Sequence, residues 1–267
     1  MLTKKYLFPF VLFIILLVNN TLFSQNTRLS DNSNIGWFSV NSTFKLTTKV
    51  GFTTEYHWRR VELVSRPQAG LWRSSINYQI HPKVQFRIGY ALIENFPYGV
   101  YPLNGFGKQF TEHRMFQALV LTDKISRLEM SHRFMLEQRW IGRYSNATLS
   151  KEDSYVYGHR WRYMLRIQLP LFKQSMEDNT LYLAAFNEAM IGFGKNVNEN
   201  IFDQNRLAFL LGYRFDSRIR MEAGYLNHIF QLAREIDGRN VFQHNNGLMF
   251  NLLLSFDWSK KQTKVNR

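Results

Sequence analysis

The sequence predicts an all-β protein, an antiparallel transmembrane β-barrel of about 10 strands behind a cleaved N-terminal signal peptide. Residues 127–140, RLEMSHRFMLEQRW, alternate apolar and charged side chains along one strand-length stretch. The charged side of this stretch would be costly in a dry soluble core, whereas a barrel keeps such residues in its interior. Long and short connections also alternate along the chain, and aromatic residues lie near the expected strand ends.

The chain of 267 residues begins with a secretory signal. Lys4 and Lys5 precede an apolar run over residues 6–18, and cleavage is expected after Ser24, so residues 1–24 form the signal peptide. The apolar run is shorter than the roughly 20 residues of a transmembrane helix. The chain contains no cysteine, which is typical of a protein that crosses an oxidising compartment.

The N-terminal part of the mature chain predicts a leader and the first barrel strand. Ile35 to Val40 is expected to form a short rim strand that ends in a turn at 41–43, so residues 25–43 are the leader. Residues 44–58 alternate over their whole length and predict the first full strand. Residues 59–68 are polar and contain Pro67, which predicts a loop.

The middle of the chain predicts strands of the same alternating kind. Strands over 72–80 and 84–92 meet at a tight turn with Pro82, and the glycine-, proline- and tyrosine-rich residues 95–111 form a long loop. Packing of this loop, a lid over the mouth and stacking on sugars are the three roles considered for it. The remaining strands of this part are expected over 112–122, 127–140, 157–169 and 181–191, with a long polar loop over 141–154 and a turn over 170–179.

The last third predicts three more strands and a basic tail. A loop over 194–205 precedes strands over 207–215 and 219–225, and residues 231–245 form another long loop. The final strand covers 248–258, and residues 259–267 form a periplasmic tail. The barrel then extends over 44–258 with ten full strands, an even number that places both of its ends on one side; twelve strands are the alternative.

The alternation assigns side chains to an inner and an outer face. The aromatic girdle is expected at Trp58, Trp72, Trp140, Tyr157 and Trp258. The inward charges are expected to form a ladder of paired arginines and glutamates that fills a narrow lumen. The ladder consists of Glu55, Arg73, Arg87, Glu112, Arg114, Glu129, Arg133, Glu137, Arg139, Arg160, Arg162, Arg166, Glu188, Arg206, Arg214, Arg220 and Glu222.

Several segments carry a resemblance to a known family. They are IGWFSVNSTFKL (35–46), FTEHRMF (110–116), SHRFMLEQRW (131–140), RWRYMLRIQLPL (160–171), NEAMIGFGKNV (187–197), NIFDQNRL (200–207) and GYLNH (224–228). These segments resemble the exported proteins grouped as domain of unknown function 2490, over nearly the whole mature chain. The resemblance implies an outer-membrane barrel of the kind found in Bacteroidetes, and it implies no established activity.

The expected function is that of an integral protein of the cell outer membrane, structural or transport-related, with a narrow anion-preferring pore as the transport form. The alternatives are an enzyme acting on envelope lipid or peptide at the outer face and a protein that binds through its outer loops. Catalytic residues are not assigned. Ser131 and His132 are adjacent in a strand and therefore point to opposite faces, and Asp203, His228 and His244 are only near expected loops.

The sequence also limits ligands and partners. The seven histidines show no metal-ligand spacing and there is no thiol, so no metal and no cofactor is expected. Asp203 and Asn205 either bind calcium with a neighbouring loop or make turn hydrogen bonds. Without Lys4 and Lys5 the formal net charge falls from +14 to +12, but the basic residues are spread over many strands, so no nucleic acid is expected. Outer-membrane lipid, lipopolysaccharide and the barrel-assembly machinery are the expected partners of a monomer.

Overall fold

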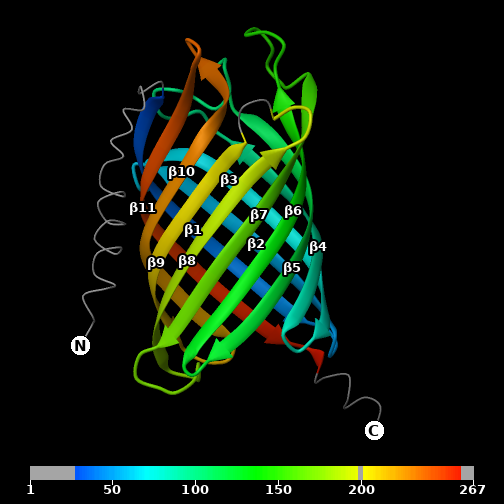
Figure 1. Cartoon of the computed structure of the whole chain (residues 1–267), viewed down its shortest axis with the longest axis vertical. Helices are drawn as coiled ribbons and strands as arrows, with labels where there is room; N and C mark the ends of the chain where they lie inside the picture. The colour runs from blue at the N-terminus through cyan, green and yellow to red at the C-terminus, as the bar shows by residue number, and fades with distance from the viewer. Residues whose placement is uncertain (1–27, 198–200, 260–267) are drawn as a thin grey trace, which may run out of the picture.

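The computed structural model describes residues 28–197 and 201–259, and its strands close into one barrel (Figure 1). This confirms the predicted all-β barrel, while the expected signal peptide lies outside the described residues. In the described part of the chain, no helix is long and apolar enough to span a bilayer. The eleven strands are β1 (Leu29–Lys45), β2 (Val50–Val61), β3 (Arg66–His81), β4 (Val84–Asn95), β5 (Phe110–Ile125), β6 (Leu128–Arg143), β7 (Ser154–Pro170), β8 (Thr180–Phe193), β9 (Phe202–Arg214), β10 (Ile219–Ile236) and β11 (Arg239–Asp257).

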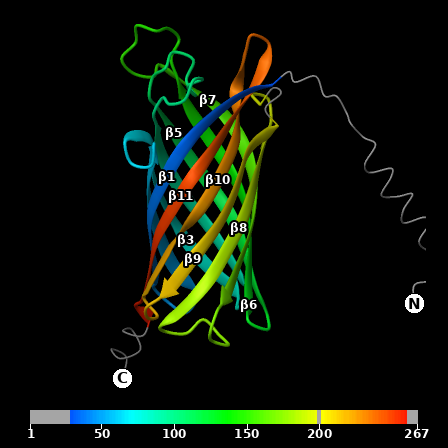
Figure 2. The ribbon, with the colours of Figure 1, turned by 90° about the vertical axis from the view of Figure 1, so that its left-hand side faces the viewer.

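The barrel has two unlike ends. The loop rim, at the top of Figures 1 and 2, carries the long connections 96–109, 144–153 and 194–201 together with the start of β1. The turn rim, at the bottom, carries the connections 46–49, 82–83, 126–127, 171–179 and 215–218 together with the end of β11. The predicted alternation of long and short connections holds only in the middle of the chain, because the connections 62–65 and 237–238 at the loop rim are short and the connection 171–179 at the turn rim is long.

The strand count of eleven corrects the expected ten and the alternative twelve, and the error lies at the first strand. The expected short rim strand over Ile35–Val40 continues to Lys45, because the polar side chains of Ser39, Asn41 and Thr43 face the interior and do not form a turn. The true turn at 46–49 divides the stretch 44–58 that had been expected as one strand. The barrel wall therefore begins at Leu29 and not at residue 44.

The odd number of strands makes β1 and β11 run parallel where the barrel closes, with Leu29 opposite Val241 and Lys45 opposite Asp257. All the other neighbouring strands are antiparallel. The described chain therefore enters at the loop rim and leaves at the turn rim, whereas the expected even count would have placed both ends on one side.

Two of the expected loops are strand. The stretch 231–245 is the tip of the β10–β11 hairpin, which rises above the loop rim in Figure 1 and turns on only Asp237 and Gly238. Both residues have positive φ, 51° and 68°, as a two-residue hairpin turn requires. The stretch 59–68 likewise ends β2 and begins β3, with a bulge that leaves Gln68 without a register partner. Both stretches contain many polar side chains, so the apolar–polar alternation that marks a strand is not visible in their sequence.

The two faces of the wall follow the alternation. On β6, Met135 and Glu137 are buried inside the barrel, whereas Leu136 lies between them on the outer face. Large apolar side chains are exposed over the outer face of every strand from β2 to β4, and again from β7 to β11. The outer face of these strands is therefore mainly apolar, and the charged side chains of the barrel lie inside.

The five girdle residues lie on the outer face. Trp140 on β6 packs against Tyr157 on β7 with ring centroids 5.1 Å apart, close to the loop rim. Trp58 packs against Phe38 in the same half of the barrel, while Trp258 packs against Phe44 at the turn rim. Trp72 contacts Tyr90 on β4, further from either rim than the other four.

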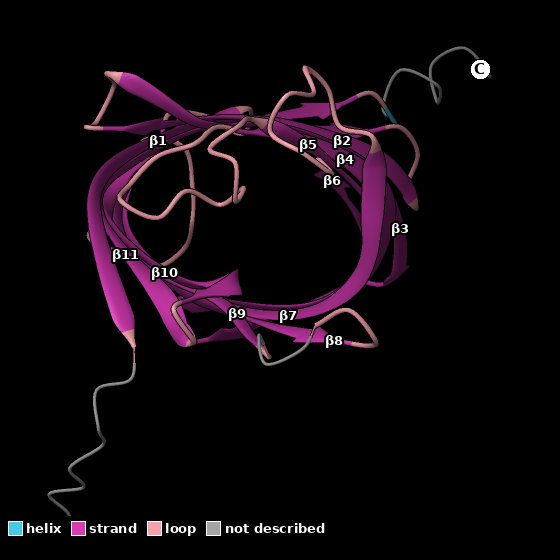
Figure 3. Cartoon of the chain, turned by 90° about the horizontal axis from the view of Figure 1, so that it is seen from above, coloured by secondary structure: helices cyan, strands magenta, loops and turns pink. Residues whose placement is uncertain are grey.

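The connection 96–109 folds into the mouth of the barrel (Figure 3). The backbone amides of Val100 and Tyr101 donate to the buried Asp31 carboxylate of β1, over 2.8 and 3.2 Å. Tyr98 is 4% exposed and belongs to the apolar cluster formed by β1, β10 and β11. Burial raises the pKa of the Tyr98 hydroxyl, so that this side chain stays neutral. The contacts are those of loop packing, one of the roles considered for this segment.

The parallel seam can be tested by a disulfide, because the chain has no cysteine. Ser39 on β1 and Asn251 on β11 are register partners, and their side chains hydrogen-bond over 2.7 Å. We expect Ser39→Cys/Asn251→Cys to lose its free thiols on oxidation, as measured by maleimide labelling after unfolding. Ser33→Cys/Asn251→Cys is the control, since Ser33 lies roughly 20 Å further along β1. Equal crosslinking of both pairs, or of neither, contradicts the eleven-strand closure.

Candidate functional site in the barrel interior

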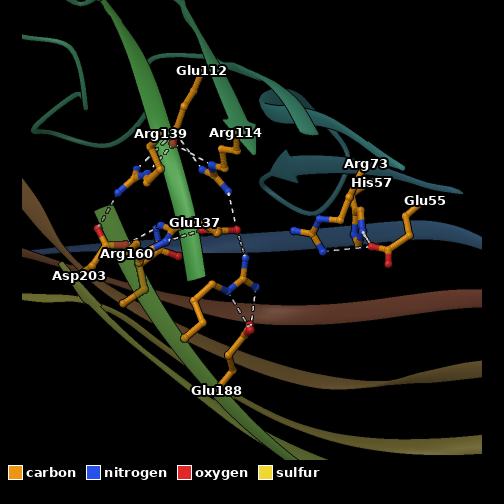
Figure 4. Close-up of polar contacts among 12 residues, drawn as sticks. Glu55, His57, Arg73, Glu112, Arg114, Glu137, Arg139, Arg160, Glu188 and Asp203 are labelled. Carbon is orange, nitrogen blue, oxygen red and sulfur yellow. Dashed lines mark hydrogen bonds and ion pairs between the residues drawn. The ribbon is translucent and has the colours of Figure 1, made fainter. Parts of the chain in front are cut away.

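A buried ionic network crosses the loop-side half of the interior (Figure 4). It consists of Glu112, Arg114, Glu137, Arg139, Arg160, Arg162, Glu188 and Asp203, four carboxylates and four arginines. The strands β5 to β9 supply these residues, and the direct register of β6 and β7 sets Glu137 opposite Arg160. The formal charges of these eight residues cancel, and Arg133 and Arg206 bring two further positive charges to Glu188 at the edge of the network.

Glu137 is the centre of the ionic network and is fully buried. Its Oε2 accepts from Arg160 Nε over 2.7 Å, and its Oε1 accepts from Arg162 Nη1 over 2.6 Å. Arg114 Nη1 lies 4.0 Å from the same Oε1. Because both arginines are also nearly or fully buried, this carboxylate neutralises charge that water does not reach.

The other carboxylates extend the ionic network in both directions. Glu112 accepts from the Nε atoms of Arg114 and Arg139, over 2.7 and 2.5 Å, and so bridges two arginines that are register partners. Glu188 accepts from Arg162 Nη2 over 2.6 Å and from Arg133 Nη2 over 2.7 Å. With Arg206 Nη1 at 3.5 Å, Glu188 therefore has arginine partners on the neighbouring strands β7 and β9 and on the more distant β6.

Asp203 is the member of the ionic network that the sequence analysis did not assign to the interior. Its Oδ2 accepts from Arg160 Nη1 over 2.5 Å, and its Oδ1 lies 3.7 Å from Arg139 Nη1. A bulge opposite Met190 and Ile191 leaves Asp203 without a register partner and turns it inward. Neither the expected calcium role nor the expected turn role agrees with these contacts, and Asn205 bonds to Asn187 on the outer face. Regular alternation cannot reveal a residue placed by a bulge.

A second group of charges lies toward the turn rim. Arg73 on β3 donates to Glu55 on β2 over 3.2 Å, and His57 contacts the same carboxylate oxygen at 3.1 Å. Arg166 on β7 pairs with Glu222 on β10, which also accepts from the Tyr182 hydroxyl over 2.8 Å. Glu55 and Arg73 are register partners on adjacent strands, like Glu137 and Arg160, whereas the pair of Arg166 with Glu222 reaches across several strands.

The turn-side cavity occupies this half of the interior and has a volume of about 360 Å³. Every strand except β5 contributes to its lining. Eight arginines and three glutamates line it, an excess of five positive charges: Arg59, Arg73, Arg87, Arg133, Arg162, Arg166, Arg206, Arg220, Glu55, Glu188 and Glu222. Sequence reasoning missed Arg59, because the stretch 59–68 was expected to be a loop.

The remaining ladder residues lie near the turn rim. Arg87 donates to Gln85 over 2.6 Å, and no carboxylate of the described residues lies within 4.0 Å of it. Glu129 is half-buried and lies 3.9 Å from Lys124. Arg214 donates to the Met176 carbonyl and to Asp178 in the connection 171–179. Arg220 lines the turn-side cavity.

The residues considered for enzyme chemistry are dispersed. His132 contacts the Tyr163 hydroxyl at 2.9 Å and not Ser131. His228 packs against Trp37 with ring centroids 5.0 Å apart and contacts Gln204, while Asp203 belongs to the ionic network. Within residues 28–197 and 201–259, no group of three or more histidine, aspartate or glutamate side chains is arranged to hold a metal ion.

The interior therefore has two electrostatic parts along one bore. The loop-side part contains a neutral, densely bonded ionic network beside the apolar packing of the connection 96–109. The turn-side part contains a cavity with a strong excess of arginine. The first arrangement fills its part of the interior with paired side chains, and the second gathers positive charge.

Comparison with known proteins identifies a family and no activity. Residues 34–239 match the model of a family described as "Protein of unknown function (DUF2490)", over most of the chain. No curated protein matches the chain.

Proposed function

Since the chain belongs to the DUF2490 family of proteins of unknown function, we propose from its interior that it is an integral outer-membrane barrel with a transport-related role. Its bore is closed in the state described above, and it prefers anions when it opens. The observation that carries this proposal is the separation of charge along the bore, with a balanced ionic network on the loop side and an arginine-rich cavity on the turn side.

The outer face supports the membrane location. Strands that cross a bilayer need about 9–11 residues, and the shortest strands here, β2 and β4, have 12. The apolar outer surface is bordered by the Trp140–Tyr157 pair toward the loop rim and by Trp258 at the turn rim. In this orientation the loop rim faces the cell exterior and the turn rim faces the periplasm, as long loops and short turns do in bacterial barrels.

The interior supports a closed and anion-preferring bore. Opening a path past Glu137 requires the buried pairs with Arg160 and Arg162 to separate, which is costly in a poorly hydrated interior. Any ion that enters from the turn rim first meets the arginine excess of the turn-side cavity. Rings of arginine select anions in pores by the same electrostatic attraction.

Planar-bilayer recording of the refolded protein tests this function. We expect the wild-type barrel to stay closed at low voltage and to show brief steps at raised voltage, whose reversal potential in a salt gradient reports anions. Fractionation of the native cells is expected to place the protein in the outer membrane. Cation-selective steps contradict the charge argument, and a barrel closed at every voltage contradicts transport in favour of a purely structural role.

A further inference from the structure

The turn-side cavity has the size and the position of a ligand site. Its volume of about 360 Å³ falls within the range of roughly 300–1,000 Å³ typical of small-molecule sites. The lining extends to Thr43, near the end of β1, and to Arg220, the second residue of β10, so that it reaches close to the turn rim. At its inner end lie Arg162 and Glu188, which also belong to the ionic network.

Arginines gather on one side of the turn-side cavity. Six of the eight come from the strands β2 to β7, namely Arg59, Arg73, Arg87, Arg133, Arg162 and Arg166. Among the described residues, no carboxylate lies within 4.0 Å of Arg59, Arg87 or Arg220. Within residues 28–197 and 201–259, the buried Nε atoms of Arg59, Arg73, Arg133 and Arg206 also have no hydrogen-bond partner. An oxyanion in the cavity would supply the acceptors that these donors lack.

Apolar side chains gather on the other side. Trp37 and Met249 are register partners across the β1–β11 seam, and both line the turn-side cavity. Leu253 continues this surface on β11, and Phe186 adds to it from β8. Phe186 and Met249 also pack in the same apolar cluster. Trp37 is already buried and is covered by Arg59 and Arg206, whereas Phe186 and Leu253 are only half-buried. A purely inorganic anion would leave Phe186 and Leu253 in contact with water, and an aryl or short alkyl group would cover them.

We propose that the turn-side cavity binds a small amphiphilic organic anion, with a phosphate or carboxylate head on the arginine side and an aryl or alkyl body on the apolar side. The arginine fork matches both kinds of oxyanion in geometry. This inference rests on the proposed function, because the ligand enters the interior of the barrel from the turn rim. It goes beyond that function because it names the class of ligand that the cavity binds. The binding takes place while the bore is closed and does not require any ion to pass through the barrel.

Isothermal titration of the protein in phosphatidylcholine nanodiscs tests the site without any need for conductance. The probes are phenyl phosphate, benzoate, inorganic phosphate and benzyl alcohol. We expect phenyl phosphate or benzoate to bind, and the tighter of the two identifies the head group. Inorganic phosphate is expected to bind about tenfold more weakly, and benzyl alcohol to give no binding heat.

Matched variants locate the binding. Arg87→Gln is expected to weaken binding of the tighter probe at least about tenfold, because Arg87 lies on the arginine side of the cavity. Arg59→Gln on the same side serves if Arg87→Gln does not fold. Arg218→Gln is the control, because it removes the same charge from an exposed turn where Arg218 pairs with Asp216. Absence of binding by both organic anions overturns the inference, as does equal binding of inorganic phosphate or benzyl alcohol. Failure to insert into the nanodisc contradicts the proposed function instead.

Discussion

Glu137→Gln is expected to lower the free energy of unfolding of the barrel by about 3–5 kcal/mol. Glutamine keeps the size of the side chain but removes the negative charge that Arg160 and Arg162 share. Both arginines are at most 2% exposed, so water cannot solvate the positive charges left behind. The penalty is therefore mainly the cost of buried, uncompensated charge, and the loss of one hydrogen bond contributes less.

Urea unfolding in phosphatidylcholine vesicles measures this effect, with the heat-dependent shift on gel electrophoresis as a check of folding. Glu129→Gln is the matched control, because Glu129 points inward from the same strand but is partly exposed and has only Lys124 nearby, at 3.9 Å. It is expected to change the unfolding free energy by less than about 1 kcal/mol. Similar losses for both variants would show that the ionic network is not a special source of stability.

The second large effect is expected one residue earlier, on the opposite face of β6. Leu136→Arg is expected to cost roughly 2–4 kcal/mol and to impair assembly, because it puts a charge on the apolar outer surface near the middle of the proposed membrane span. The alternation explains why residues 136 and 137 respond to charge in opposite ways. Arginine is harmful at position 136, where the surroundings are apolar, and loss of charge is harmful at position 137.

Ile125→Arg provides the comparison for Leu136→Arg. Ile125 is the last residue of β5, lies at the turn rim and is 62% exposed. An arginine at the membrane boundary costs only about 0–1 kcal/mol, since its side chain reaches water. The same unfolding assay should therefore separate the two variants. A folded and inserted Leu136→Arg variant with wild-type stability would show that this face of β6 does not contact lipid.

The alternating pattern predicted the barrel and the two faces of its strands. In each regular strand, the alternation of apolar and polar residues shows which side chains face outward and which face inward. On β6, the predicted inward residues Arg133, Glu137 and Arg139 all have interior partners, and Leu136 lies outside. The predicted strand number was wrong because the turn at 46–49 was missed. The inward residues of the strands on both sides of this turn are polar, as turn residues are, so the sequence does not mark where the turn lies. The Asp237–Gly238 dipeptide is typical of a two-residue hairpin turn, but its polar flanking residues led to the prediction of a loop.

The partners within the interior could not be predicted from alternation alone. Pairing between adjacent strands, such as Glu55 with Arg73, follows from the register once the turns are known. Contacts such as Arg133 with Glu188 and Arg166 with Glu222 span more than one strand and depend on barrel curvature and side-chain length. Asp203 depends on a bulge, and the turn-side cavity depends on all of these together.

The parallel pairing of β1 with β11 has a consequence for the order of folding. Ser39 and Asn251, which meet across the seam, are 212 positions apart in the chain, whereas each hairpin joins neighbouring segments. Bringing together two strands so far apart in the chain loses loop-closure entropy before any contact between them forms, so this pairing step is slow. Until β11 is complete, β1 has a free edge able to pair with another chain. The seam is therefore the place where a nascent barrel stays open longest and where a strand of an assembly factor could be held and then exchanged.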